Sequence, residues 1–230
     1  MSRPALAPLK SLPSGDRIAG LMKNRAYADI KRLILDETIG PGEFLSERQL
    51  AARLQMSKTP IKSALERLEA EGFIGVSPQQ GIVVHDLSLD EVADQFEIRE
   101  VLEPYVVRRL AGRLTAEQGE RMRENLRRQE AAVEATDVQR NVWLDAEFHI
   151  LWCEFLGNSE ILTTMQRLRD RIHRVISRVS TRNPARMKEG YEEHRLLAEA
   201  VLTGSGDLAA ERMLHHLSYG KQFLLSPRRP

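Results

Sequence analysis

Two short helices and the turn between them are encoded by residues 45–65, which read LSERQLAARLQMSKTPIKSAL. Ser46 can cap the first helix, and Gln49 three residues later completes a capping box. Pro60 is tolerated only in the first turn of a helix, so the helix that follows the turn is expected to begin near Ser57. The spacing therefore predicts a helix of about eight residues, a tight turn and a longer helix.

The flanking sequence extends this pair into a larger pattern. Upstream, a helical periodicity begins at Tyr27 and stops near the Gly-Pro-Gly of residues 40–42. Downstream, Gly72 ends the third helix, and residues 73–76 and 82–84 are predicted to be two short strands joined by a turn. Three helices followed by a two-stranded ribbon are the layout of a winged helix-turn-helix, a DNA-binding unit. The alternative is a small α+β packing unit that binds no nucleic acid.

The remainder of the chain contains helical patterns and no convincing strand. Capping boxes at Ser88 with Glu91 and at Thr115 with Gln118 support two of the helix starts. The six predicted helices cover about 88–113, 115–135, 138–157, 159–181, 185–203 and 207–225. We therefore expect a mostly α chain with an N-terminal winged helix-turn-helix and two-stranded β wing, followed by an antiparallel bundle of about six helices.

The expected domains follow from these boundaries. A flexible arm is expected over residues 1–24, which contain three prolines. The DNA-binding domain is expected over 25–87, and an all-helical effector-binding and dimerisation domain over 88–226.

Composition excludes several classes of protein. The 230 residues are 42% hydrophobic and 29% charged, a globular profile, and no apolar run approaches the length of a membrane helix. Cys153 is the only cysteine, which excludes an internal disulfide and a cysteine-ligated zinc finger. A reducing cytoplasm is the expected setting. The net charge of +1 does not by itself indicate nucleic-acid binding, so that case depends on where the basic residues lie.

Basic and hydroxyl side chains gather where a winged helix-turn-helix would meet DNA. Lys58, Thr59 and Lys62 lie at the N-terminal end of the third helix, which is the part that reads base edges. Arg48 adds positive charge on the second helix. Gln80-Gly81 at the ribbon tip could reach the minor groove. For each residue taken alone, the alternative is a solvated side chain.

The same residues carry a resemblance to a known family. The N-terminal part of the chain resembles the DNA-binding domain of GntR-family bacterial transcription regulators. The residues that carry the resemblance are 33–34, 39–42, 45–51, 57–65, 68–72 and Gly81. The resemblance implies that Arg48, Lys58, Thr59, Lys62 and the wing beside Gly81 contact operator DNA. This chain has lysine at 58 and 62 where the family usually has arginine, and lysine cannot make the two-pronged contact with guanine. The usual operator sequence of the family is therefore not expected here.

The helical half contains a candidate metal site. Asp145 and His149 are four residues apart on one predicted helix, so both project from the same face. His194 and His216 lie on or beside the apolar stripes of two later helices. Three imidazoles and a carboxylate suit Zn, Ni, Mn or Fe. The alternatives are a surface pair for Asp145 with His149, a polar helix-start residue for His194 and a hydrogen-bonded core histidine for His216.

A second resemblance covers about 135 residues of this half. This half resembles the FCD ligand-binding domain of the FadR-like subfamily. The resemblance is carried by Asp145-x-x-Phe148-His149, Glu193-His194-Arg195, Met213-x-x-His216-Leu217 and Glu97-x-Arg99-x-x-Leu102-Glu103. The resemblance implies that the aspartate and three histidines hold a divalent ion at the bottom of an effector cavity. Six rather than seven helices would place the chain in the smaller VanR-like group.

These observations predict a DNA-binding transcription regulator, a repressor, that acts as a homodimer on double-stranded operator DNA. The expected effector is a small organic acid or sugar acid, with Arg99 and Arg171 as candidate partners of its carboxylate. A salt bridge from Arg99 to Glu103 is the alternative for the first of these. Two rival functions remain open: a metal-dependent hydrolase built on the bundle, and a regulator that senses the metal itself.

Overall fold

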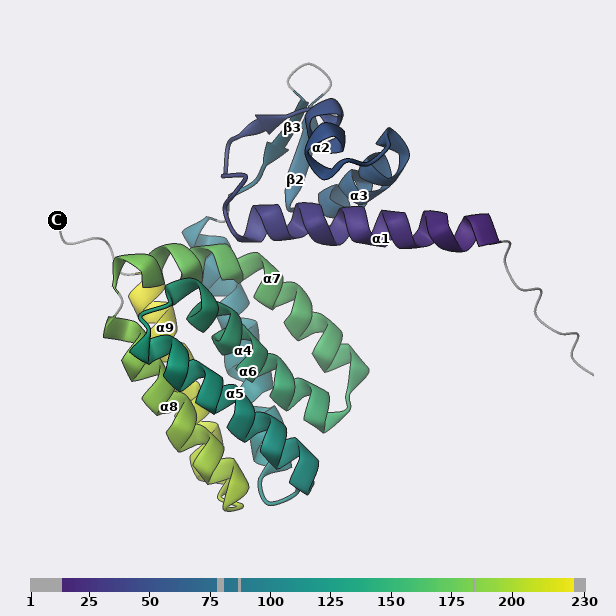
Figure 1. Ribbon diagram of the computed structural model, residues 1–230. Coiled ribbons are helices and arrows are strands. Elements are labelled where there is room, and N and C mark those ends of the chain that lie inside the picture. Colours follow the sequence, from purple (N-terminus) through teal and green to yellow (C-terminus); the bar gives the residue numbers. More distant parts are fainter. Residues whose placement is uncertain (1–13, 78–80, 87, 184, 226–230) are drawn as a thin grey trace, which may run out of the picture. The chain divides into compact units, whose positions relative to one another are not determined.

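The computed structural model of the protein describes residues 14–77, 81–86, 88–183 and 185–225 (Figure 1). Its elements are α1 (Ser14–Leu35), β1 (Phe44–Leu45), α2 (Glu47–Leu54), α3 (Lys58–Ala70), β2 (Ile74–Ser77), β3 (Gly81–Val84), α4 (Leu89–Leu110), α5 (Ala116–Glu134), α6 (Val138–Leu156), α7 (Ser159–Arg182), α8 (Ala185–Leu202) and α9 (Gly206–Leu225). The chain divides into two compact units, residues 1–86 and 87–230. Across the described residues, every helix is too short or too polar to span a lipid bilayer.

The N-terminal unit is a three-helix cluster with a small sheet. Helix α1 packs on α3 and α2, and α3 buries its apolar face against them. The two helices predicted from residues 45–65 are present, with the Ser46–Gln49 capping box formed in both directions. Gln55 ends α2 in a left-handed conformation, φ 53°, and this residue makes the turn tight. The helix-turn-helix order predicted from the sequence is confirmed.

The sheet has one strand more than the sequence predicted. It contains three antiparallel strands in the order β1-β3-β2, not the two of the expected wing. Strand β1 is only two residues long and pairs Phe44 with Val83 and Leu45 with Ile82. Two residues carry no alternating pattern, so nothing local in the sequence could distinguish this strand from a loop.

Helix α1 also differs from the prediction. It begins at Ser14, whereas the sequence was expected to stay irregular through residue 24. The correction concerns residues 14–24, because residues 1–13 lie outside the described part of the chain. The three prolines of the expected arm all precede Ser14, and residues 16–24 are mostly good helix formers that extend the helix seeded from Tyr27.

The C-terminal unit is a bundle of the six helices α4–α9 within the described residues. Helix α4 packs against α9, α6 and α7, while α5 lies against α6 and α8. Its core is apolar and includes Phe148, Trp152, Met122 and Val106, all at most 1% exposed. The predicted bundle is confirmed. The capping boxes at Ser88 and Thr115 are also formed, and they set the starts of α4 and α5.

Candidate functional sites

The exposed face of α3 carries the cations expected to meet DNA. Lys58, Thr59 and Lys62 are exposed at its N-terminal end, and Arg48 is exposed on α2. The apolar side of α3, from Pro60 to Leu68, is buried in the unit. No ion pair of Arg48, Lys58 or Lys62 with an acid is found in the described part of this unit. Their charges are therefore available to a polyanion.

Three other arginines of the N-terminal unit behave differently. Arg25, Arg32 and Arg67 each pair with an acid four residues later in the chain. Their charges are therefore compensated, unlike those at the start of α3.

The wing glycine has a role within the fold. Gly81 has φ +89°, and a Cβ there would lie 2.5 Å from the Leu45 carbonyl oxygen. Only glycine lets β3 approach β1 this closely. Gln80, the second wing residue expected to reach DNA, lies outside the described residues.

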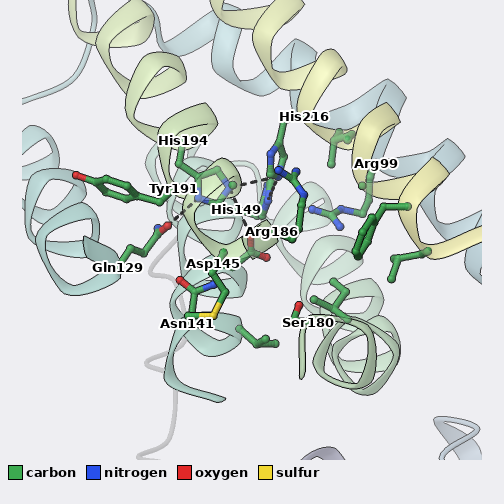
Figure 2. Close-up of a pocket in the computed structure, with 18 of the residues that line it drawn as sticks. Arg99, Gln129, Asn141, Asp145, His149, Ser180, Arg186, Tyr191, His194 and His216 are labelled. Atoms are coloured by element: carbon green, nitrogen blue, oxygen red, sulfur yellow. Dashed lines mark hydrogen bonds and ion pairs between the residues drawn. The ribbon is translucent and has the colours of Figure 1, made fainter. Parts of the chain in front are cut away.

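In the C-terminal unit, four predicted side chains converge (Figure 2). Asp145 and His149 come from α6, His194 from α8 and His216 from α9, and each offers one ligand atom within 4.8 Å of the others. The Nε2 atom of His216 lies 3.2 Å from Nε2 of His194 and 3.3 Å from Nε2 of His149. Asp145 Oδ1 lies 3.5 Å from Nε2 of His194. The three histidines are buried and the aspartate is partly exposed.

The opposite nitrogen of each imidazole faces an oxygen from a different part of the bundle. His149 Nδ1 contacts Glu103 of α4, and His216 Nδ1 lies 2.5 Å from Glu193 Oε2 of α8. His194 Nδ1 lies 2.8 Å from Gln129 Oε1 of α5. Because carboxylate and amide oxygens can only accept, each Nδ1 is the donor. All three Nε2 lone pairs therefore point at one another.

The two glutamates of this cluster are ionised, and each is also paired with an arginine. Burial raises the pKa of Glu103, but the charge of Arg99 and the interaction with His149 outweigh burial and lower the pKa to about 2. Burial likewise opposes the shift at Glu193, where hydrogen bonds from His216 and Arg186 lower the pKa to about 2. Arg99 Nε donates to Glu103 at 2.6 Å, and Arg186 grips Glu193 with both terminal nitrogens.

Burial also keeps two of the imidazoles neutral. It holds the pKa of His194 well below the ordinary value, and a positive charge on His216 or His149 would lower that pKa further. It lowers the pKa of His216 as well, although the hydrogen bond to Glu193 opposes the shift. Counted with all three rings in the neutral form that can ligate a metal ion, the cluster has three carboxylates, Asp145, Glu103 and Glu193, against the guanidinium groups of Arg99 and Arg186. Its formal charge is −1.

A cavity opens beside the cluster. It is lined by Asp145 and the three histidines, together with polar side chains from the five helices α4–α8 and apolar ones from α4, α6, α7, α8 and α9. Among the polar lining residues are Arg99, Arg186, Asn141, Ser180 and Tyr191 (Figure 2). A smaller, more apolar cavity adjoins it against α7 and shares Arg99, Asp145 and His149 with the first.

The structure places the two predicted effector arginines differently. Arg99 makes the buried salt bridge to Glu103 that was the alternative for this residue, and it also lines both cavities. Arg171 is not among the residues that line either cavity, which corrects its selection from the sequence. Arg169 and His173 line the smaller cavity, and a residue midway between them projects from the other side of the helix. Arg186, which the sequence analysis did not select, lines the first cavity.

Sequence reasoning missed the residues that support the histidines. Gln129 and Asn125 were not singled out, Glu193 was named only within a quoted motif, and Glu103 was named within a motif and as a partner of Arg99. One signal was available: Met122, Asn125, Gln129 and Ala132 follow helical spacing along one stripe of α5, and all four are buried. Polar residues at core positions of such a stripe need partners, which indicates a polar network.

Comparison with known proteins agrees with both halves. Residues 22–84 match the family of bacterial regulatory proteins named gntR, and residues 94–219 match the FCD domain. The chain is 27% identical over 196 residues to the HTH-type transcriptional repressor RspR of Escherichia coli strain K12, covering 85% of this chain and 86% of that protein. It is 28% identical over 191 residues to the gluconate operon transcriptional repressor of Bacillus licheniformis, covering 80% and 77%.

A solved structure shares the fold. E. coli McbR/YncC superimposes with a TM-score of 0.79 at 22% sequence identity, over 88% of this chain and 96% of that one. The matched families and the named relatives are regulators of transcription and not enzymes. The helix-turn-helix, the helical bundle and these matches together show that the chain belongs to the GntR family of bacterial transcription regulators and carries an FCD effector-binding domain.

Proposed function

We propose that this regulator holds a divalent metal ion at Asp145, His149, His194 and His216, and that a small carboxylate effector bound beside the ion controls operator affinity. The effector belongs to the organic acids or sugar acids. The observation that carries the proposal is the convergence of three Nε2 lone pairs in a buried cluster.

The donor set fits a metal ion for an electrostatic reason. With outward Nδ1–H groups on three neutral imidazoles, Nε2 of His216 lies 3.2 Å and 3.3 Å from the Nε2 atoms of His194 and His149, and their lone pairs repel one another unless a cation lies between them. Ligating histidines in metalloproteins usually donate the other N–H to a carboxylate or carbonyl oxygen, as all three do here. Nitrogen-rich sites of this kind suit Zn, Ni, Fe or Mn.

The effector's charge follows from the charge of the cluster. A divalent ion would change the formal charge from −1 to +1 and offer open coordination positions to an anion. Arg99 uses its Nε for Glu103, so its terminal nitrogens remain available at the cavity wall. A carboxylate would meet both groups, since guanidinium and carboxylate pair in a two-pronged geometry.

DNA recognition is assigned to the exposed face of α3 and its neighbours. Lys58, Thr59 and Lys62 are proposed to contact the major groove, with Arg48 on phosphate and the wing at Gln80-Gly81 on the minor groove. The support is the uncompensated charge on this face of the N-terminal unit.

The proposed assembly is a cytoplasmic homodimer on a near-palindromic operator, acting as a repressor. Ile98, Val101 and Tyr105 form an apolar stripe on α4 and are 42%, 72% and 50% exposed. Such a stripe is typical of a surface that a second copy covers. The six helices of the bundle also favour the VanR-like group. Light scattering of the protein in solution checks the dimer.

The experiment that tests the proposal is His194→Ala. Loss of one ligand should lower metal content, reduce thermal stability and abolish the influence of carboxylates on DNA binding. Operator affinity without effector should survive, because the ligands belong to the unit that lacks the DNA-binding helices. His215→Ala is the matched control, since His215 is exposed on α9 beside His216. A His194→Ala protein with full metal content and a normal effector response contradicts the proposal. A DNA response to metal alone would indicate a metal sensor.

A further inference from the structure

A chain of buried amides connects His194 to helix α6 through α5. Asn125 and Gln129 are each 1% exposed. Asn125 Nδ2 donates to the Leu144 carbonyl oxygen at 3.1 Å, Gln129 Nε2 donates to Asn125 Oδ1 at 2.6 Å, and Gln129 Oε1 faces His194 Nδ1 at 2.8 Å. We infer that this amide relay, Asn125 and Gln129, sets the tautomer of His194 and so positions its ring for a metal ion. The inference rests on the proposed metal site.

The Leu144 carbonyl oxygen determines which way every hydrogen bond of the amide relay is donated. A backbone carbonyl can only accept, so the Leu144 oxygen requires the NH₂ group of Asn125. Asn125 Oδ1 is then the only group left to face Gln129, and it requires the NH₂ group of Gln129. Gln129 Oε1 must therefore face His194. Rotating either amide by half a turn would bring two oxygens or two NH₂ groups together in a buried site, which is unfavourable because buried polar groups would lose their partners.

The consequence appears at the other end of the imidazole. With Nδ1 donating to Gln129, the Nε2 lone pair of His194 faces His216 Nε2 and Asp145 Oδ1 (Figure 2). The opposite tautomer would place an N–H group at that position and exclude a metal ion. Leu144 directly precedes Asp145, so the relay fastens the ligand of α8 to the helix that carries two other ligands.

The relay also differs from the supports of the other two imidazoles. His149 and His216 donate to ionised glutamates, whereas His194 donates to a neutral amide. A third glutamate would make the charge of the cluster −2, and a divalent ion would then leave no positive charge for an anion. The amides therefore orient the third imidazole without adding a negative charge.

The test combines a spectroscopic measurement with metal binding. In metal-free wild-type protein labelled with ¹⁵N-histidine, the His194 ring is expected as the Nδ1–H tautomer, its signals assigned by their absence from His194→Ala. Gln129→Leu removes the acceptor and is expected to lower Zn²⁺ affinity about 10- to 100-fold, measured by competition with a chromophoric chelator. Asn125→Leu touches no ligand but frees the Gln129 amide to rotate, so a smaller loss in the same direction is expected, with mixed His194 tautomers.

Gln95→Leu is the matched control. Gln95 is a buried glutamine of α4 whose Oε1 has no hydrogen-bond partner among the described residues, and its loss should leave Zn²⁺ affinity unchanged. A wild-type His194 in the Nε2–H form overturns the inference, as does a folded Gln129→Leu protein that binds Zn²⁺ like the wild type. Failure of the wild type to bind Zn²⁺ overturns the metal site instead. The tautomer of the wild type then still decides the relay: Nδ1–H supports it and Nε2–H overturns it.

Discussion

Some single residues in the helical core carry charges that ordinarily stay in water. Arg99 is 6% exposed and Glu103 is 1% exposed. A buried ion pair adds little stability compared with an apolar pair, but removing one partner costs about 3–5 kcal/mol because the other charge stays buried. Glu103 also accepts from His149, so the pair keeps a metal-ligand candidate in place as well as neutralising itself.

At the DNA face, the residue that tests recognition most directly is Lys62. Lys62→Ala should weaken operator binding by about 1–3 kcal/mol if the ammonium group reaches a base. If Lys62 holds only phosphate, the loss should be similar on random DNA and the salt dependence shallower. Arg32→Ala is the control, because Arg32 is exposed but paired with Asp36. Titration of both variants at fixed salt decides, and an unchanged operator affinity for Lys62→Ala removes this residue from the interface.

Glu71 links the first and third helices of the N-terminal unit. Its carboxylate accepts from Tyr27 at 2.6 Å, from Lys31 at 3.0 Å and from Arg67 at 3.0 Å. Burial raises the pKa of Glu71, but the hydrogen bonds from Tyr27 and Lys31 outweigh burial and leave the pKa below its ordinary value of 4.5. Folding therefore favours the ionised form.

This shift predicts a pH dependence of stability. A lowered carboxyl pKa contributes stability above the unfolded value of about 4.5, and the contribution disappears as the pH falls through the folded value. Glu71→Gln should cost the N-terminal unit about 1–3 kcal/mol at neutral pH and progressively less below pH 4.5. Urea unfolding of both proteins at pH values from roughly 7 down to 3, which include the range in which glutamate side chains titrate, measures the difference. A difference that stays constant with pH would contradict the assignment.

At the scale of elements, the three-stranded sheet depends on one glycine. Gly81→Ala would place a Cβ 2.5 Å from the Leu45 carbonyl at a φ of +89°, so β1 must separate from β3. Gly42→Ala has a similar φ of +75° but meets nothing within 4 Å, and it should cost only the backbone strain, about 1–2 kcal/mol. Thermal unfolding should show a clearly larger loss for Gly81→Ala, and equal losses would mean that the contact with Leu45 is easily relieved.

The elements that the sequence predicted well are those with local signals. Capping boxes at Ser46, Ser88 and Thr115, and Pro60 in a first turn, lie within a few residues of the helix starts they indicate. Strand β1 was missed because its only evidence is pairing with a segment almost forty residues away.

The residues of the candidate site were likewise predictable only where the sequence carries a local signal for them. The helical spacing of Asp145 and His149 places both on one face, His194 and His216 lie on or beside apolar stripes, and the resemblance to a family supported all four as one site. Arg171 was chosen by residue type alone, and the side of α7 on which it projects could not be judged without the position of the cavity. Asn125 and Gln129 act through a carbonyl of another helix, and no sequence pattern records such a contact.

At the scale of the whole molecule, the two compact units should respond separately to metal removal. All four candidate ligands belong to the C-terminal unit. An ion present at 100 times its Kd would stabilise that unit by about 2.7 kcal/mol, which corresponds to roughly 5–10 °C. Calorimetry with Zn²⁺ and with a chelator should move only the transition of this unit. A shift of both transitions, or of neither, contradicts the expectation.

The charge of the histidine cluster has a consequence for what the regulator can report. With the proposed metal site, the metal-free cluster at −1 would repel an organic acid and the metal-bound cluster at +1 would attract one, so neither solute would produce the response alone. Such a regulator would require both solutes together, and it would respond to the acid only when metal supply is sufficient. Under metal limitation the genes it controls would keep their effector-free state however much acid accumulates, and nutrient sensing would be subordinate to metal status.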